Sequence, residues 1–300
     1  MRRKDRIDPT GAGWLMAFAL LFAVNQVVIR WTNQGLQPVF YAGLRSVAAM
    51  LPVALWMHWR GLPLRIEPGT VGAGLLIGLA FSSEFLFLFL ALDLTTVVRT
   101  TIIFYSMPVW LALAGHFFLP GERITPLKAA GLALAFAGVA WAIVNRGGGG
   151  GEPVGRVSLL GDLCALLGSM GWAATAFLAR GSAMKRVVPE VQLMWMLAVS
   201  AVVLLALSPV FGPLIRDLVP LHLVALLAQA VVVVALGYIG WLRLLSVYPP
   251  SAVASFSFLT PVFGVLLGWL LLREPVGPAT VGALVLVAGG IVLMNRAPRG

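Results

Sequence analysis

Two charged side chains, Glu84 and Arg45, lie inside long apolar stretches of the sequence and are its first candidates for chemistry. A charged side chain within an apolar segment is costly, so its presence indicates a functional site. In helices that rise about 1.5 Å per residue, both side chains lie roughly 10–12 Å below the same helix ends. They are therefore placed to form an ion pair, or to meet the two charged ends of a zwitterionic ligand.

Two other interpretations of these residues remain open. Arg45 and Glu84 would also be explained by a structural ion pair that fixes two neighbouring helices. Alternatively, Glu84 is buried in its protonated, uncharged form.

Two segments each place three polar, aromatic or proline residues on one helical face, at positions i, i+4 and i+7. The first presents Thr101, Tyr105 and Pro108, and the second presents Ser251, Ser255 and Phe258. These faces are expected to line a binding site from two related helices, with Tyr105 matching Phe258. The alternative for the hydroxyl groups is that they join helices within lipid. Pro108 and Pro261 each free a backbone carbonyl and are candidate hinges.

Further candidates are amides and aromatic rings within apolar segments. The amides of Asn25 and Gln229 cannot face lipid without loss, so they face a cavity or a neighbouring helix. Trp172 lies too deep for the interfacial aromatic belt, and with Tyr238 it is a candidate to stack on an aromatic ligand. The candidate substrate-binding residues are therefore Tyr105, Phe258, Glu84, Arg45, Trp172, Asn25, Gln229, Tyr238, Thr101 and Ser255.

Composition decides which elements position these residues. The 300 residues are 60% hydrophobic and 11% charged, with a mean hydropathy of +0.97. Soluble domains contain about 25% charged residues, so the chain is predicted to be an all-α, multi-pass membrane protein. The apolar runs are continuous and do not alternate, which argues against a membrane β-barrel. A single cysteine, Cys164, excludes an intramolecular disulfide and a multi-cysteine metal site.

Ten membrane spans are predicted between turn-forming residues. They cover roughly residues 13–30, 38–58, 69–92, 96–118, 125–145, 157–180, 190–211, 220–245, 250–272 and 276–295. The glycine run at 147–151 reads as a flexible linker. It divides the chain into a five-helix half at 1–146, a linker at 147–156 and a second five-helix half at 157–300.

The basic residues indicate the orientation of the chain. Fourteen of the 21 Lys and Arg residues flank the side on which the N-terminus lies, and six flank the other side. This bias predicts that both termini are cytoplasmic. The net charge of +10 is then a topology signal, so no nucleic-acid partner is expected.

The two halves share a motif that begins at Pro108 and at Pro261. Each proline is followed by a glutamate, Glu122 or Glu274, which precedes the next helix and is expected to favour its N-terminus. The glutamates are 152 positions apart and the prolines 153. Five spans per half is an odd number, so the second half must enter the membrane from the opposite side. Inverted repeats of this kind are a recurrent architecture of secondary transporters, in which the substrate site lies near the midplane between the repeats.

The motif resembles that of the ten-helix drug/metabolite transporter superfamily. It reads Pro108-Val109-Trp110, Glu122, Pro126 and Gly131 in the first half, and Pro261-Val262-Phe263, Glu274, Pro278 and Gly282 in the second. The chain is most similar to bacterial aromatic amino-acid exporters of that family, on its aromatic-rich helices. The resemblance implies that the fifth and tenth spans pack behind a central cavity. It also implies residence in the bacterial inner membrane and alternating-access transport.

The sequence lacks the spacings of catalytic, nucleotide-binding or metal-binding motifs, so no enzyme activity and no cofactor are expected. The expected partners are a small-molecule substrate and the lipid bilayer, with the chain acting as a monomer. The alternatives are an exporter of another metabolite or drug cation, a flippase for lipids or lipid-linked sugars, and an intramembrane transferase. Proton coupling through Glu84 and facilitated diffusion both remain open.

Overall fold

The computed structural model describes residues 8–63, 65–118, 124–145, 159–238, 240, 244, 247–248 and 258–295. The described residues are helical, apart from turns and an isolated antiparallel bridge between Leu36 and Ile215. The α-helices are α1 (Pro9–Thr32), α2 (Pro38–Trp59), α3 (Val71–Leu94), α4 (Val97–Phe104), α5 (Met107–Phe118), α6 (Pro126–Val144), α7 (Leu159–Gly181), α8 (Pro189–Leu207), α9 (Pro220–Ala228), α12 (Leu259–Leu272) and α13 (Pro278–Asn295). Short 3-10 helices follow α7 (η1, Ala183–Arg186) and α8 (η2, Ser208–Phe211), and the π-helix η3 (Gln229–Leu236) continues α9.

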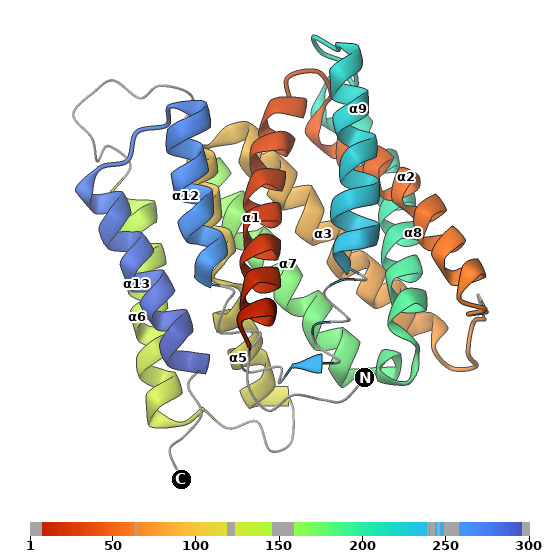
Figure 1. The fold of residues 1–300 in the computed structure, drawn as a ribbon, viewed down its shortest axis with the longest axis horizontal. Coiled ribbons are helices and arrows are strands. Elements are labelled where there is room, and N and C mark those ends of the chain that lie inside the picture. The colour runs from red at the N-terminus through yellow and green to blue at the C-terminus, as the bar shows by residue number, and fades with distance from the viewer. Residues whose placement is uncertain are drawn as a thin grey trace.

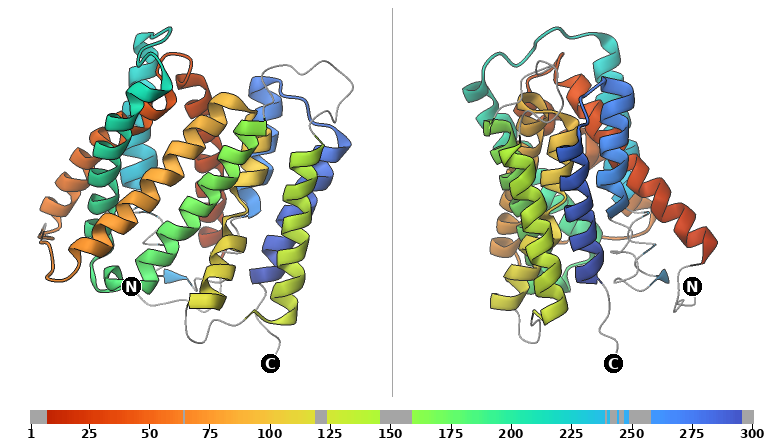
Figure 2. Two further views of the ribbon diagram at one scale, coloured as in Figure 1. Left: turned by 180° about the vertical axis from the view of Figure 1, so that it is seen from behind. Right: turned by 90° about the vertical axis from the view of Figure 1, so that its left-hand side faces the viewer.

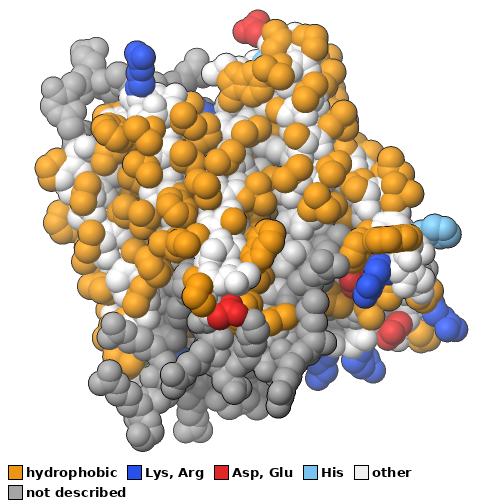
Figure 3. Space-filling view, in the orientation of Figure 1, with side chains coloured by type: hydrophobic (Ala, Val, Ile, Leu, Met, Phe, Trp, Pro, Cys, Tyr) orange, Lys and Arg blue, Asp and Glu red, His pale blue; other side chains and the backbone are white. Residues whose placement is uncertain are grey.

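Seven helical segments of the described chain are long and apolar enough to cross a membrane. They correspond to the first seven predicted spans. The later segments, Pro220–Leu236, Leu259–Leu272 and Pro278–Met294, are shorter apolar helices in the described residues. Large apolar side chains such as Leu51 and Val202 lie exposed on the outer surface, and hydrophobic side chains cover most of the described surface in Figure 3. An apolar surface of this extent is stable only in contact with lipid, so the chain is a multi-pass membrane protein.

The bundle has two ends that recur below. The terminal end is where α1 begins and α13 ends, at the bottom of Figure 1. The distal end is the opposite one, where α3 ends and α4 begins. Helices α6 and α13 pack side by side at one edge of the bundle (Figure 2). Gly131 and Gly290 allow this contact, because a Cβ atom on Gly290 would stand 2.6 Å from the carbonyl oxygen of Gly131.

The fourth predicted span is interrupted between α4 and α5. Helix α4 ends at Phe104 and α5 begins at Met107, next to Pro108. A proline has no N–H for the carbonyl four residues earlier and clashes with it, here the carbonyl of Phe104. The proline therefore explains the break, and its use as a hinge stays a prediction. In the second half Pro261 lies near the start of α12, which Phe258 precedes, and residues 249–257 are outside the described ones.

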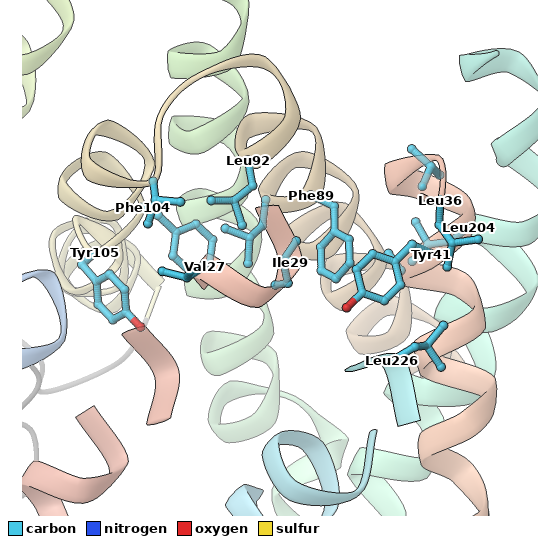
Figure 4. Close-up of a cluster of buried hydrophobic side chains, with 14 residues drawn as sticks. Val27, Ile29, Leu36, Tyr41, Phe89, Leu92, Phe104, Tyr105, Leu204 and Leu226 are labelled. Carbon is cyan, nitrogen blue, oxygen red and sulfur yellow. The ribbon is translucent and has the colours of Figure 1, made fainter. Parts of the chain in front are cut away.

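A hydrophobic cluster, called the distal core, fills the bundle near its distal end (Figure 4). Its members are Val27, Ile29, Leu36, Val39, Tyr41, Ala42, Leu88, Phe89, Leu92, Val97, Phe104, Tyr105, Leu204 and Leu226. They come from α1, α2, α3, α4, α8 and α9 and from the segments that join them. Because packed apolar side chains leave little room between the helices, the distal core closes this end of the bundle.

Candidate functional site

The two charged residues singled out in the sequence, Arg45 and Glu84, are both buried inside the bundle. Arg45 is 2% exposed and Glu84 is 6% exposed. Their charges interact electrostatically, yet the ion pairs formed by the described residues lie elsewhere in the bundle. The prediction of a direct ion pair is therefore wrong for this structure, because the arginine takes aromatic partners instead.

The guanidinium of Arg45 lies over two phenyl rings of α3. Its Cζ atom is 4.2 Å from the ring centre of Phe85 and 4.8 Å from that of Phe89. Cation–π attraction at these distances stabilises the charge and orients the planar group. The buried Nε–H of Arg45 has no acceptor among the described residues. Arg45 is thus a fixed cation with hydrogen-bonding capacity to spare, which suits it to an anionic ligand group.

Glu84 is positioned by the close approach of α3 and α7. A Cβ atom on Gly171 would stand 2.7 Å from the backbone nitrogen of Glu84, so only glycine allows this contact. Thr175, one helical turn further along α7, brings its hydroxyl group beside the Glu84 carboxyl group. Gly171 and Thr175 were not among the predicted site residues. Their spacing of four residues on one helix face is the signal that would have indicated them.

Tyr105 and Trp172, predicted separately, are in contact. The Trp172 ring stacks on Phe104 at 5.3 Å between ring centres and meets the edge of Tyr105 at 5.5 Å. Tyr105 lies at the break between α4 and α5, and Trp172 comes from α7. The break in the fourth span therefore presents an aromatic group to the other half of the chain.

The two predicted amides also face the interior of the bundle. The side-chain nitrogen of Gln229 donates to the backbone oxygen of Asn25 at 3.4 Å, and the Tyr41 hydroxyl donates to the Gln229 side-chain oxygen. The ring of Tyr41 packs against Phe89, one of the two rings below Arg45. The side-chain oxygen of Asn25 is buried and has no donor among the described residues. Tyr41, one turn before Arg45, is a polar neighbour that the sequence analysis missed.

The remaining described candidates have other contacts. Thr101 donates to the side-chain oxygen of Gln26 at 2.5 Å and fills the space beside Gly264, as expected of a residue that joins helices. Phe258 packs against the cluster between α4, α6, α7, α12 and α13. The Tyr238 hydroxyl donates to the Pro189 carbonyl at 3.1 Å, where α8 begins. Ser255, like Ser251, lies outside the described residues.

No metal cluster competes with this region in the described part of the chain. Its His, Cys, Asp and Glu residues form no group of three that could hold a metal ion. A groove of about 310 Å³ lies on the outer surface between α2 and η3, lined by Pro52, Leu55, Trp56, Trp59, Val231, Ala235 and Leu236. This lining is apolar and suits lipid chains, so the groove is separate from the Arg45–Glu84 region.

Comparison with known proteins connects this geometry to a family. The profile of the EamA-like transporter family matches residues 9–144 and, a second time, residues 159–296. The chain belongs to the EamA-like transporter family. This EamA-like chain is therefore a membrane transporter and not an enzyme, as the sequence predicted.

Relatives of the EamA-like chain cover nearly its whole length. An uncharacterized protein of Pseudomonas aeruginosa is 31% identical over 93% of this chain and 92% of its own length. A probable amino-acid metabolite efflux pump of Escherichia coli is 26% identical over 96% of this chain and 94% of its own. A crystal structure with a TM-score of 0.66 and 21% identity covers 95% of this chain and 96% of that chain, and so shares its fold.

Proposed function

We propose that this EamA-like transporter exports aromatic and other apolar amino acids by alternating access. The observation that carries the proposal is that Arg45 and Glu84 are both buried and form no ion pair with each other. An amino acid brings one group for each of them, a carboxylate for Arg45 and an ammonium for Glu84. Tyr105 of the first half, with Trp172 and Phe258 of the second, would contact an aromatic side chain.

Two further features of the chain support this substrate class. A relative at 26% identity is named a probable amino-acid metabolite efflux pump. The buried side-chain oxygen of Asn25 is available to a ligand N–H group, and Gln229 positions the backbone of Asn25. The region thus contains a cation, an anion, an amide acceptor and aromatic rings.

The proposed architecture is ten membrane spans in two inverted five-helix repeats, residues 1–146 and 157–300, joined by the linker at 147–156. The double match of the family profile supports the duplication. The pairing of α6 with α13, the fifth span of each half, is the contact expected between corresponding helices of two repeats. The repeats would rock against each other about Pro108 and Pro261.

The bias of basic residues supports an orientation with both termini in the cytoplasm of a bacterium and the chain in its inner membrane. The distal end then faces the periplasm. The packing of the distal core at that end supports assigning the structure to a state that is closed to the periplasm.

The experiment that tests the function is substrate flux in proteoliposomes containing the purified chain. We expect labelled phenylalanine to cross the membrane faster than in empty liposomes and to be inhibited by tryptophan and leucine. A pH gradient imposed in parallel measures proton coupling. Absence of flux for every amino acid tried would reject the substrate class and leave the family assignment intact.

A second prediction concerns Glu84 and proton coupling. If flux depends on the pH gradient, Glu84→Gln should abolish that dependence, since the amide cannot release a proton. Flux with and without a gradient, measured for both proteins, checks this. Glu67→Gln, an exposed residue in the α2–α3 connection, is the matched control and should keep the dependence. Unchanged coupling in Glu84→Gln would assign the proton to another group.

A further inference from the structure

The distal end is held by polar contacts in which each half of the chain supplies one partner. The most unusual is made by Glu274, in the turn between α12 and α13. Its two carboxylate oxygens accept hydrogen bonds from the backbone nitrogens of Val97 and Val98, each at 2.8 Å. The first N–H groups of a helix lack partners within it and attract a negative charge. The prediction that Glu274 serves its own following helix is wrong, because it binds the start of α4 instead.

The backbone around Glu274 is shaped for this contact. Arg273 has a φ of 54°, and among the described residues it is the non-glycine residue with a positive φ. This left-handed conformation is strained for a side chain such as arginine. It turns the chain so that the Glu274 N–H bonds to the Gly268 carbonyl at 3.1 Å. A Cβ atom on Gly268 would stand 2.8 Å from the Glu274 carboxylate, so glycine also opens the approach.

Two more contacts join the halves at the same end. Arg99 of α4 forms an ion pair with Asp162 of α7 at 2.6 Å. Arg216, before α9, forms one with Asp93 of α3 at 2.8 Å. Next to Arg216, the segment containing Leu36 pairs with the segment containing Ile215. All these partners stand at helix ends or in connecting segments, where water can replace them when the halves separate.

We propose that these contacts form a releasable gate at the distal end, in which the Glu274 carboxylate holds the start of α4 against the turn between α12 and α13. Opening the gate separates Glu274 from Val97 and Val98, and hydrates both sides. The strained backbone conformation of Arg273 is kept in the closed state because it directs the Glu274 carboxylate toward the start of α4. The gate rests on the proposed function for its purpose, which is to control release of substrate on the distal side.

A disulfide across the gate tests whether it must open. Leu36 and Ile215 face each other across an antiparallel bridge, where Cα atoms are about 4.5–5.5 Å apart, within the range of disulfides. The variant is Leu36→Cys with Ile215→Cys, in a Cys164→Ala background that removes the native cysteine. Oxidation should reduce flux to below about a tenth of the reduced rate, and dithiothreitol should restore it. Equal flux in the oxidised and reduced forms would overturn the gate.

The rate at which this disulfide forms reports the fraction of molecules in which the gate is closed. We expect Glu274→Ala to slow cross-linking by roughly threefold or more, because two buried N–H groups lose their acceptor. Burial raises the pKa of the Glu274 carboxyl group, against the lowering effect of these N–H groups and Arg30. Glu274→Gln keeps one oxygen acceptor for these N–H groups, so it should fall between the wild type and Glu274→Ala. Glu67→Ala is the control and should cross-link at the parent rate.

The cross-linking measurement needs no substrate, so it separates failure of the gate from failure of the proposed function. Slower cross-linking in Glu274→Ala, together with absent amino-acid flux, would support the gate and reject amino acids as the substrate class. An unchanged cross-linking rate in Glu274→Ala would reject the gate. If that variant does not fold, Asp93→Asn replaces it. Its ion pair is partly exposed, and its loss should slow cross-linking about twofold, whereas an unchanged rate overturns the proposal.

Discussion

Arg45→Gln is expected to reduce phenylalanine flux by about a hundredfold, since removing one partner of a buried, hydrogen-bonded charge pair costs about 2–5 kcal/mol. The shorter glutamine side chain still fits over the rings of Phe85 and Phe89, and it can hydrogen-bond a carboxylate, but it brings no charge. Because the arginine is 2% exposed, solvent screens its charge weakly, and the effect should persist at high salt. Initial flux at several substrate concentrations is the measurement.

Comparison with phenethylamine, the phenylalanine analogue that lacks a carboxylate, gives this prediction its specificity. If Arg45 binds the carboxylate, Arg45→Gln should weaken inhibition of labelled-substrate flux by phenylalanine much more than inhibition by phenethylamine. Arg45→Lys should be intermediate, because an ammonium keeps the charge but loses the planar contact with the two rings. Equal losses for both compounds would mean that Arg45 supports the fold and does not contact substrate.

The sequence alone predicted most of the helices, since long apolar runs between glycine and proline turns are a strong signal. The fifth and tenth spans illustrate this, because α6 (Pro126–Val144) and α13 (Pro278–Asn295) lie within two residues of the predicted ranges 125–145 and 276–295. Contacts between distant segments were not predictable in the same way. Whether Arg45 meets a carboxylate or two phenyl rings depends on the rotation of α2 against α3, which no local pattern encodes.

Glu274 and Thr101 show the same limit at single residues. Glu274 stands directly before a helix in the sequence, and the local rule assigns it to that helix. The fold brings the first turn of α4, 176 residues earlier, to its carboxylate instead. Thr101 shares a helical face with Tyr105, yet it bonds to Gln26 of α1. A helical face can contact several neighbours, so spacing identifies the face without identifying the partner.

The largest expected effect on stability comes from Asp162. Its carboxylate is fully buried and receives the Nε and Nη2 groups of Arg99 at 3.1 and 2.6 Å. Asp162→Asn leaves that guanidinium without a counter-charge, which costs about 3–5 kcal/mol for a buried pair. We therefore expect a large fall in the free energy of unfolding, measured by denaturation with sodium dodecyl sulfate in mixed micelles.

Asp93→Asn is the matched control, because it makes the same chemical change in the other ion pair between the halves. The side chains of Arg216 and Asp93 are 34% and 22% exposed, and exposed pairs contribute only about 0–1 kcal/mol. Replacing both members of the buried pair, as Arg99→Met with Asp162→Leu, should recover most of the stability lost in Asp162→Asn, since no unpaired charge remains. Equal destabilisation by Asp162→Asn and Asp93→Asn would show that water reaches both pairs alike, and the distal end would then be more open than its packing indicates.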